Sequence, residues 1–312
     1  MEHPAPRAEP AGATIHSPGT VPMTQYLLAG VDGSPESTAA ARWAADEAAR
    51  RRVGLRLVHA QTWLDDVHAD QVRPTDVRGL TRRMLEDARQ EVLAAHPGLE
   101  VRAELVGDGE PTDALVEAAT AAELLVLGSR GLGGFRGLLV GSFGLAVAAR
   151  CEVPTVLVRA TGAEGTGRPD RTEVVLGVDT RSPSDEVVDF AFQQAARLGA
   201  TLRAVHGWTP PPVWGYAGWV PPMAEAEQFR AIEAELLAEA LAGRREKYPE
   251  VTVVEDCRIG TGSSVLVDVS AGAALVVVGR RRRRHEVGMR LGPIAHAVLH
   301  HAEAPVAVVP HD

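Results

Sequence analysis

Short apolar runs alternate with amphipathic segments along the chain. In the first half, the runs are YLLAGV (26–31), LRLVHA (55–60), VRAELV (101–106), LLVLG (124–128) and PTVLV (154–158). Apolar residues at helical spacing predict helices between them, at 35–52, 73–95, 111–121 and 142–150. The runs lack polar alternation, which is typical of parallel strands buried on both faces. The pattern therefore predicts an α/β fold, a doubly wound parallel sheet with helices on both faces.

The second half of the chain repeats this pattern. Segment 27–63 has a counterpart in 174–209, and His59 is matched by His206 at a spacing of 147 residues. The run ELLVLG is matched by ALVVVG, 151 residues further along. A repeat of this length indicates a duplicated domain. We therefore expect a disordered tail over 1–24, a five-stranded domain over 25–160, a linker over 161–172 and a second five-stranded domain over 173–310.

Composition narrows the class of protein. The formal net charge is −9, which disfavours non-specific binding to nucleic acid. No apolar run approaches the roughly 20 residues that a membrane span needs, and the first residues lack the apolar core of a signal peptide. Cys151 and Cys257 are the only cysteines and have no metal-ligand spacing. We expect a cytoplasmic protein that does not enter a membrane.

A glycine-rich segment, GSRGLGGFRGLLVGS, occupies residues 128–142. Because the carboxyl ends of parallel strands share one edge, Asp32 after the first run should lie near Gly128 after the fourth. Glycine backbone approaches a ligand closely, and the N–H groups that open a helix attract anions. Ser142 would either cap that helix or offer its hydroxyl, and Arg130 adds positive charge. The segment is therefore either a flexible crossover or a cradle for an anion such as phosphate.

The spacing Gly128-x2-Gly131-x9-Gly141-Ser142, with Asp32 and the LVHA motif, resembles the ATP-binding branch of the universal stress protein family. The resemblance covers nearly all of residues 25–310 as two domains in tandem. It implies ATP, with Mg or Mn near Asp32, adenine near Ala60 and phosphates held by the glycine motif. It also implies antiparallel pairing of the two fifth strands, and frequent homodimers. The expected nucleotide-binding residues are Gly30, Asp32, Ala60, Leu127, Gly128, Arg130, Gly131, Gly141, Ser142 and Phe143.

The second half keeps only part of the glycine motif. Arg282 stands in place of a glycine and Pro293 in place of the serine. Proline lacks the hydroxyl and the N–H that a phosphate would use, although it suits a first helical turn. Arginines 280–284 would either compensate through their side chains, contact an acidic partner or nucleic acid, or form a solvated loop. The candidate residues of a second site are Gly177, Asp179, Gly207, Val278, Gly279, Arg282, Gly292, Pro293 and Ile294.

Three other features bear on function. The aromatic, proline-rich segment 208–222 is either a contact surface for a protein partner or a packed loop. His296 and His300 stand one helical turn apart, but no third metal ligand is evident.

No catalytic constellation stands out. The resemblance therefore favours an ATP-binding regulatory or protective stress protein; the alternatives are a nucleotide-independent interaction module and a slow ATPase or autophosphorylating enzyme.

Overall fold

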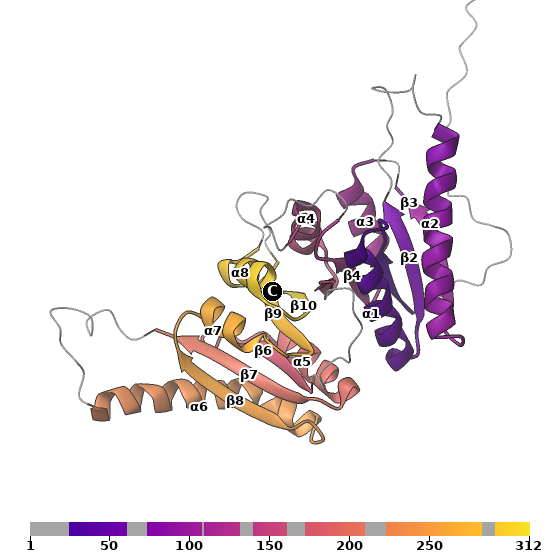
Figure 1. Cartoon of the computed structure of the whole chain (residues 1–312). Helices are drawn as coiled ribbons and strands as arrows, with labels where there is room; N and C mark the ends of the chain where they lie inside the picture. The colour runs from indigo at the N-terminus through magenta and orange to yellow at the C-terminus, as the bar shows by residue number, and fades with distance from the viewer. Residues whose placement is uncertain are drawn as a thin grey trace, which may run out of the picture.

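The computed structural model describes residues 25–60, 74–107, 109–131, 140–160, 172–209, 223–282 and 291–312. These residues form one ten-stranded sheet in the order β3-β2-β1-β4-β5-β10-β9-β6-β7-β8, with helices packed on it (Figure 1). Five strands come from each half of the chain and run parallel within that half. The predicted α/β fold is confirmed.

The elements follow the repeat in the sequence. The first half contains β1 (Tyr26–Gly30), α1 (Pro35–Arg51), β2 (Gly54–Ala60), α2 (Pro74–Ala95), β3 (Val101–Val106), α3 (Pro111–Ala119), β4 (Leu124–Gly128), α4 (Ser142–Arg150) and β5 (Thr155–Val158). The second half contains β6 (Glu173–Gly177), α5 (Asp185–Leu198), β7 (Thr201–Trp208), α6 (Met223–Lys247), β8 (Val253–Ile259), α7 (Gly262–Val269), β9 (Leu275–Arg281), α8 (Pro293–His301) and β10 (Val306–His311). The predicted elements of the first half agree with these bounds to within two residues.

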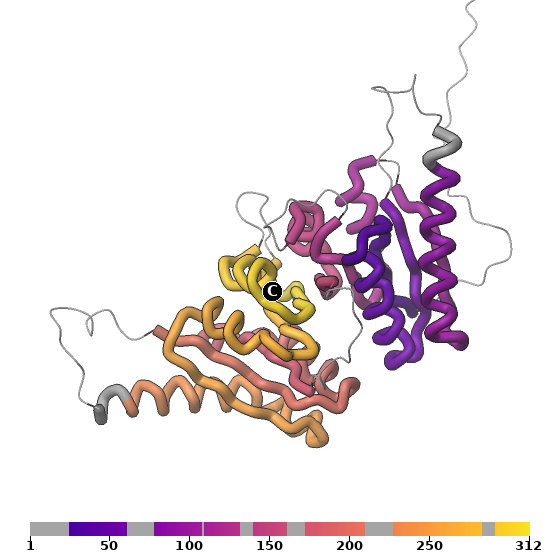
Figure 2. The backbone as a smooth tube through the Cα atoms, viewed as in Figure 1, coloured from indigo at the N-terminus to yellow at the C-terminus, as the bar shows by residue number. Residues whose placement is uncertain are grey.

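The two halves meet where β5 pairs with β10. This pairing is antiparallel, with Val306 opposite Leu157 and Val308 opposite Thr155, as the family resemblance implied. Figure 2 shows the two halves on either side of this junction, with α4 and α8 beside it. Since each fifth strand covers the other's open edge, the pairing removes two exposed rows of backbone hydrogen-bonding groups.

Local sequence explains where the helices begin. Ser34 caps α1 by accepting a hydrogen bond from the Ser37 N–H, and Pro35 follows in the first turn. In α4 the N-cap is Gly141, whose extended backbone (φ −77°, ψ 153°) precedes the first helical residue. The predicted alternative in which Ser142 caps this helix is therefore wrong. Ser142 is itself the first residue of the helix, and no side chain caps it.

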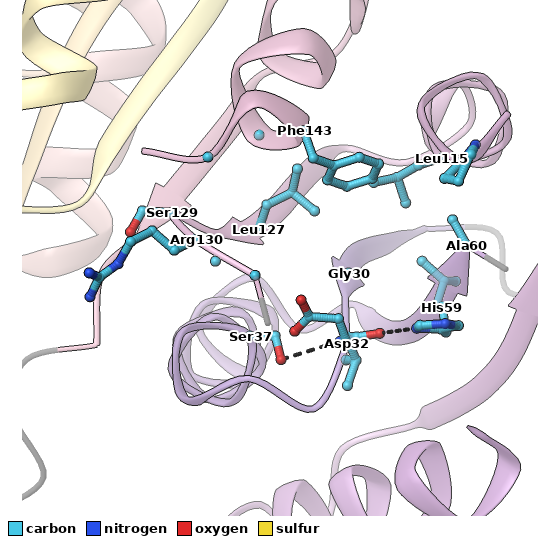
Figure 3. Close-up of a pocket in the computed structure, with 17 residues that line it drawn as sticks. Gly30, Asp32, Ser37, His59, Ala60, Leu115, Leu127, Ser129, Arg130 and Phe143 are labelled. Atoms are coloured by element: carbon cyan, nitrogen blue, oxygen red, sulfur yellow. Dashed lines mark hydrogen bonds between the residues drawn. The ribbon is translucent and has the colours of Figure 1, made fainter. Parts of the chain in front are cut away.

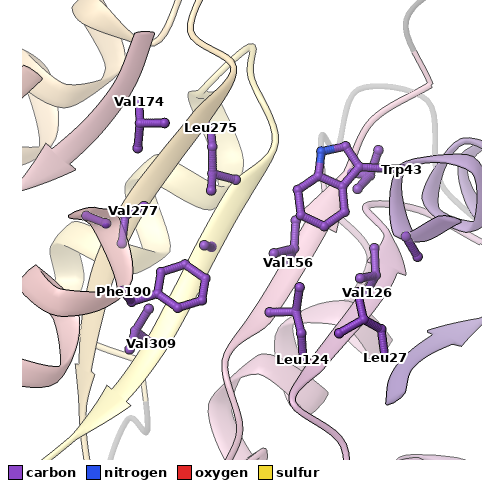
Figure 4. Close-up of a cluster of buried hydrophobic side chains, with 14 of the residues drawn as sticks. Leu27, Trp43, Leu124, Val126, Val156, Val174, Phe190, Leu275, Val277 and Val309 are labelled. Carbon is purple, nitrogen blue, oxygen red and sulfur yellow. The ribbon is translucent and has the colours of Figure 1, made fainter. Parts of the chain in front are cut away.

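Apolar side chains fill both faces of the sheet. One cluster includes residues of α1, α2, α5 and α6 and crosses the junction through Val156 and Val309 (Figure 4). The other lies under α3, α4, α7 and α8 and includes Leu157 and Val308. Burying each large apolar side chain stabilises the fold by about 1.5–3 kcal/mol. The shared clusters therefore join the two halves through packing as well as through backbone pairing.

None of the described helices is long and apolar enough to cross a lipid bilayer. Some predicted segments lie outside the described residues: the tail (1–24), most of the linker (161–171), much of the glycine loop (132–139), most of the aromatic segment (210–222) and the rest of the arginine run (283–284).

Candidate functional site

A cavity of about 310 Å³ opens at the carboxyl ends of β1, β2 and β4. This volume lies at the lower end of the usual range for small-molecule sites, about 300–1,000 Å³. Every predicted nucleotide-binding residue except Ser142 lines this first cavity. Its lining is Gly30, Val31, Asp32, Ser37, Val58, His59, Ala60, Pro111, Leu115, Leu127, Gly128, Ser129, Arg130, Gly131, Gly141, Phe143 and Gly144.

Asp32 lies just beyond the end of β1 and forms part of the polar wall of the first cavity. Its Oδ1 accepts hydrogen bonds from the backbone N–H of Ser34 at 2.9 Å and from the Ser34 hydroxyl at 2.6 Å. A Cβ atom at Gly131 would lie only 2.6 Å from Asp32 Oδ2. The glycine therefore lets the backbone after β4 approach the carboxylate.

Gly128 has a structural role of its own. A Cβ at this position would lie 2.7 Å from the carbonyl carbon of Glu36 and 2.8 Å from the backbone nitrogen of Ser37. Only glycine lets the end of β4 pass this close to the first turn of α1. Arg130, two residues later, pairs with the Glu36 carboxylate at 2.6 Å. The start of the glycine motif thus holds β4 against α1.

The opposite wall of the first cavity is apolar. It is formed by Val58, Ala60, Leu115, Leu127 and Phe143. In Figure 3 the Phe143 ring lies beside Leu115 and Leu127, across the cavity from Asp32. The Phe143 side chain is 41% exposed, so this wall continues to the protein surface.

Sequence reasoning did not assign several of the lining residues, and two of them, Leu115 and Ser129, differ in how easily they could have been found. Leu115, on α3, recurs as Leu266 at the 151-residue spacing of the repeat, and that match was an available signal. Ser129 has no such signal, because its counterpart is Arg280. The Ser129 hydroxyl oxygen is buried and has no hydrogen-bond partner among the described residues.

His59 and His206 share one contact at the ends of their strands, through Nδ1, although His206 Nε2 also lies 3.3 Å from Glu233 Oε2. His59 Nδ1 lies 2.7 Å from the Val31 carbonyl oxygen, and His206 Nδ1 lies 3.0 Å from that of Val178. In both cases the ring N–H donates to a carbonyl of the neighbouring strand segment. Each imidazole thus ties two strands together at the edge of a cavity.

A second cavity of about 460 Å³ lies at the carboxyl ends of β6, β7 and β9. All the candidate second-site residues except Arg282 line it. Arg282 Nε instead donates to Glu152 Oε2 at 2.8 Å, in the other half of the chain. The lining is Gly177, Val178, Asp179, Ser182, Pro183, Ser184, Val187, Val188, Val205, His206, Gly207, Gly262, Leu266, Val278, Gly279, Arg280, Arg281, Gly292, Pro293, Ile294, Ala295 and His311.

The second cavity differs from the first in its charged groups. Arg281 pairs with Asp179 at 3.5 Å, whereas its counterpart Arg130 pairs with a glutamate of α1. His311, at the end of β10, lies 2.8 Å from where a Cβ of Gly279 would be. The equivalent position after β5 is Ala160. The second cavity therefore contains an imidazole that the first one lacks.

The histidines of α8 form a cluster on one side of the helix. The rings of His296 and His300 have centroids 4.6 Å apart. Burial, with the nearby charges of His296, His301 and Arg159, lowers the pKa of His300. Among the described residues, no three His, Cys, Asp or Glu side chains are grouped so that they could hold a metal ion.

The two cysteines are in unreactive surroundings. Burial raises the pKa of the Cys151 thiol and, together with nearby carboxylates, that of Cys257. Because the thiolate is the nucleophilic form, neither side chain is activated for covalent chemistry.

The chain is similar to known proteins along nearly its whole length. The sequence profile of the universal stress protein family matches residues 23–159 and 171–310. Universal stress protein Rv2005c of Mycobacterium tuberculosis is 35% identical over 299 residues, covering 92% of this chain and 98% of that protein. Universal stress protein Rv2623 of the same species is 33% identical over 295 residues, covering 90% and 95%.

A solved structure shares the fold. The crystal structure of a universal stress protein from Archaeoglobus fulgidus DSM 4304 aligns with a TM-score of 0.65 and 16% identity, covering 93% of this chain and 99% of that one. The two profile matches fall on the two halves of the ten-stranded sheet. The chain therefore belongs to the universal stress protein family and carries two of its domains in tandem.

Proposed function

We propose that the first cavity binds ATP and that the nucleotide regulates the protein's role in a stress response. The observation that carries this proposal is the division of the cavity wall. Val58, Ala60, Leu115, Leu127 and Phe143 form an apolar surface that suits a purine and ribose. The facing wall carries glycine backbone, hydroxyl groups and Arg130, which suit phosphates. A nucleotide has this same division between an apolar end and an anionic end.

The phosphate end of the proposed site is built from backbone and small polar groups. Gly141 precedes the first turn of α4, where unpaired N–H groups and the helix dipole favour an anion. The buried Ser129 hydroxyl lacks a hydrogen-bond partner among the described residues. Because leaving a buried polar group unpaired costs about 1–3 kcal/mol, a phosphate oxygen that accepted a hydrogen bond from this hydroxyl would relieve the cost.

The residues present also fit a divalent ion carried by the nucleotide. Asp32 supplies a carboxylate in the polar wall, beside the backbone of Gly131. Hard cations such as Mg²⁺ are usually held by one or two carboxylates together with phosphate oxygens. When bound, the ion would neutralise phosphate charge. Asp32 would hold it, and the Ser34 hydrogen bonds to Oδ1 would fix the direction of that carboxylate.

We propose binding rather than rapid hydrolysis as the function of this cavity. His59 is the imidazole in its lining, and its Nδ1 donates to the Val31 carbonyl. Asp32 is oriented by Ser34 and faces the proposed phosphates, where its charge is needed for the ion. Neither group is assigned to activate a water molecule, so nucleotide occupancy would act by changing the conformation or partner choice of the protein.

Calorimetric titration with ATP and Mg²⁺ tests the proposal. The double variant Gly141→Val, Ser142→Ala obstructs the start of α4 and removes a hydroxyl. A Cβ at Gly141 meets nothing closer than 3.8 Å, so we expect the variant to fold. The matched control is Gly292→Val, Pro293→Ala at the equivalent place in the second domain. We expect the first variant to lose at least about tenfold in ATP affinity at the first site, or about 1.4 kcal/mol. The control should keep a first-site affinity within about fivefold of the wild type. Absence of binding to the wild-type chain overturns the proposal, and unchanged binding by the first variant places the site elsewhere.

A further inference from the structure

Helix α4 begins at the first cavity, and its other end is hydrogen-bonded to a residue that lines the second cavity. Its N-cap, Gly141, lines the first cavity. Its C-cap is Cys151, whose carbonyl oxygen accepts a hydrogen bond from Nη2 of Arg280. Arg280 belongs to β9 and lines the second cavity. A nine-residue helix and one arginine thus join the two cavities across the domain junction.

Helix α8 makes the reciprocal connection. Its N-cap, Gly292, lines the second cavity. The carbonyl oxygens of Leu299 and His300, in its last turn, accept hydrogen bonds from Nη2 of Arg159 at 3.0 and 3.1 Å. Arg159 directly follows Val158, whose carbonyl accepts the N–H of Ser129 at 2.7 Å. Ser129 lines the first cavity, so this path also leads from one cavity to the other.

Arg280 and Arg159 lie where a change at one cavity can reach the other. Each guanidinium lies at the carboxyl end of a helix, where the free carbonyls and the helix dipole attract a cation. Arg280 is only 5% exposed, and its Nε is buried without a partner among the described residues. Burial lowers the pKa of Arg280, while Glu152, 3.6 Å away, opposes that shift. A polar ligand atom in the second cavity would offer Nε a partner, so the residue is suited to respond to occupancy.

We propose that the two cavities are energetically coupled, with Arg280 and α4 transmitting occupancy in one direction and Arg159 and α8 in the other. The inference rests on the proposed binding of ATP in the first cavity. Arg280 is a positioning residue for α4, because it acts on the first cavity through the far end of that helix. Coupling between two sites is reciprocal, so filling either cavity changes the affinity of the other by the same factor.

The test uses amide hydrogen exchange on the full chain, with ATP and Mg²⁺ as the probe. The background is Gly292→Val, which obstructs the second cavity; a Cβ there meets no atom within 4 Å, so the fold should be kept. ATP then enters the first cavity alone. The account predicts that exchange changes both around α4 and in residues 278–282 of β9 and the loop after it.

Two arginine variants on this background identify the path. Arg280→Met should abolish the change in residues 278–282 while ATP still binds. Arg282→Met is the matched control: Arg282 also contacts Glu152 across the junction but does not line the second cavity, and this variant should keep the change. In chains whose second cavity is intact and also filled by ATP, the affinity for ATP at the first site should differ from that of the Gly292→Val chain by about fivefold.

The outcomes separate the two proposals. ATP binding with exchange changes confined to the first domain overturns the coupling and leaves the proposed function standing. Loss of the distant change in both arginine variants overturns the assignment to Arg280. If no chain, including the wild type, binds ATP, the proposed function fails and the coupling fails with it.

Discussion

The guanidinium of Arg130 lies 2.6 Å from the carboxylate of Glu36, which ties the edge of the first cavity to helix α1. The equivalent arginine of the second domain, Arg281, instead reaches Asp179, the aspartate of its own cavity, at 3.5 Å. The duplicated domains thus place the same residue type at the same point of the fold but pair it differently. Arg130 also lines the first cavity, and under the proposed function it is the cation that contacts the phosphates.

Arg130→Met should weaken ATP binding much more than adenosine binding. A hydrogen bond to a charged group contributes about 1.5–3 kcal/mol, so a partial loss predicts about a tenfold lower affinity for ATP. Adenosine has no phosphate for Arg130 to contact and should bind as before. Calorimetric titration with both ligands checks this, with Arg150→Met as a control, because Arg150 pairs with the exposed Asp113 away from the lining. An equal loss for both ligands would show that Arg130 acts through the fold.

Gly128→Ala should destabilise the protein, whereas Gly292→Ala should change its stability little. The new Cβ at Gly128 would lie within 2.8 Å of α1 backbone, but at Gly292 it meets no atom within 4 Å. Overpacking against backbone costs about 1–3 kcal/mol. Urea unfolding of the two variants measures the difference, and equal midpoints would contradict the close approach of β4 to α1.

His300 should make stability depend on pH. Burial lowers its pKa below the ordinary value of 6.5, so the unfolded chain binds the proton more readily than the folded chain. The free energy of unfolding contributed by this group is complete above pH 6.5 and falls as the pH drops through 6.5 toward the lowered pKa. His300→Gln should flatten this part of the profile. Urea unfolding of the wild type and the variant at about pH 8 and about pH 5.5 measures this difference. An equal change in the free energy of unfolding between the two pH values in both proteins would refute the assignment to His300.

Arg159→Met should loosen the junction between the domains. The side chain donates to two carbonyls at the end of α8, and we expect its loss to lower the free energy of unfolding by about 1–2 kcal/mol. Arg282→Met removes a more exposed contact to Glu152, which should cost at most about 1 kcal/mol. Thermal unfolding followed by circular dichroism ranks the two. An effect of Arg282→Met as large as that of Arg159→Met would contradict this ranking.

Much of the fold was predictable because it depends on local pattern. The apolar run PTVLV and its counterpart in β10 predict strands, and the family resemblance predicted their pairing. The directions of individual side chains were harder to predict from the sequence. Arg282 aligns with Gly131 in the sequence, yet its guanidinium contacts Glu152 of the other domain. A contact across the domain junction leaves no periodic signal in a single sequence.

The sequence predicted the part of the candidate site that is formed by the glycine motif and the ends of the strands. The repeat matches Leu115 on α3 to Leu266, but only the packing of α3 against the sheet shows that Leu115 lines the first cavity. His311 entered the second cavity because β10 extends past the point where β5 ends, pairing with β9 as far as Arg281. Strand length at a domain junction is set by tertiary pairing, so the sequence pattern alone did not identify this residue.

Photolabelling with an azido-adenine analogue of ATP, followed by mass spectrometry of the labelled peptides, would show directly whether the first cavity binds the nucleotide. We expect label on the apolar wall of the first cavity, in peptides that contain Val58–Ala60, Leu115 or Phe143. Excess ATP should suppress this labelling, and Gly141→Val should reduce it. ATP-protected label found only in the second domain, or no ATP-protected label in the wild-type chain, would contradict the account.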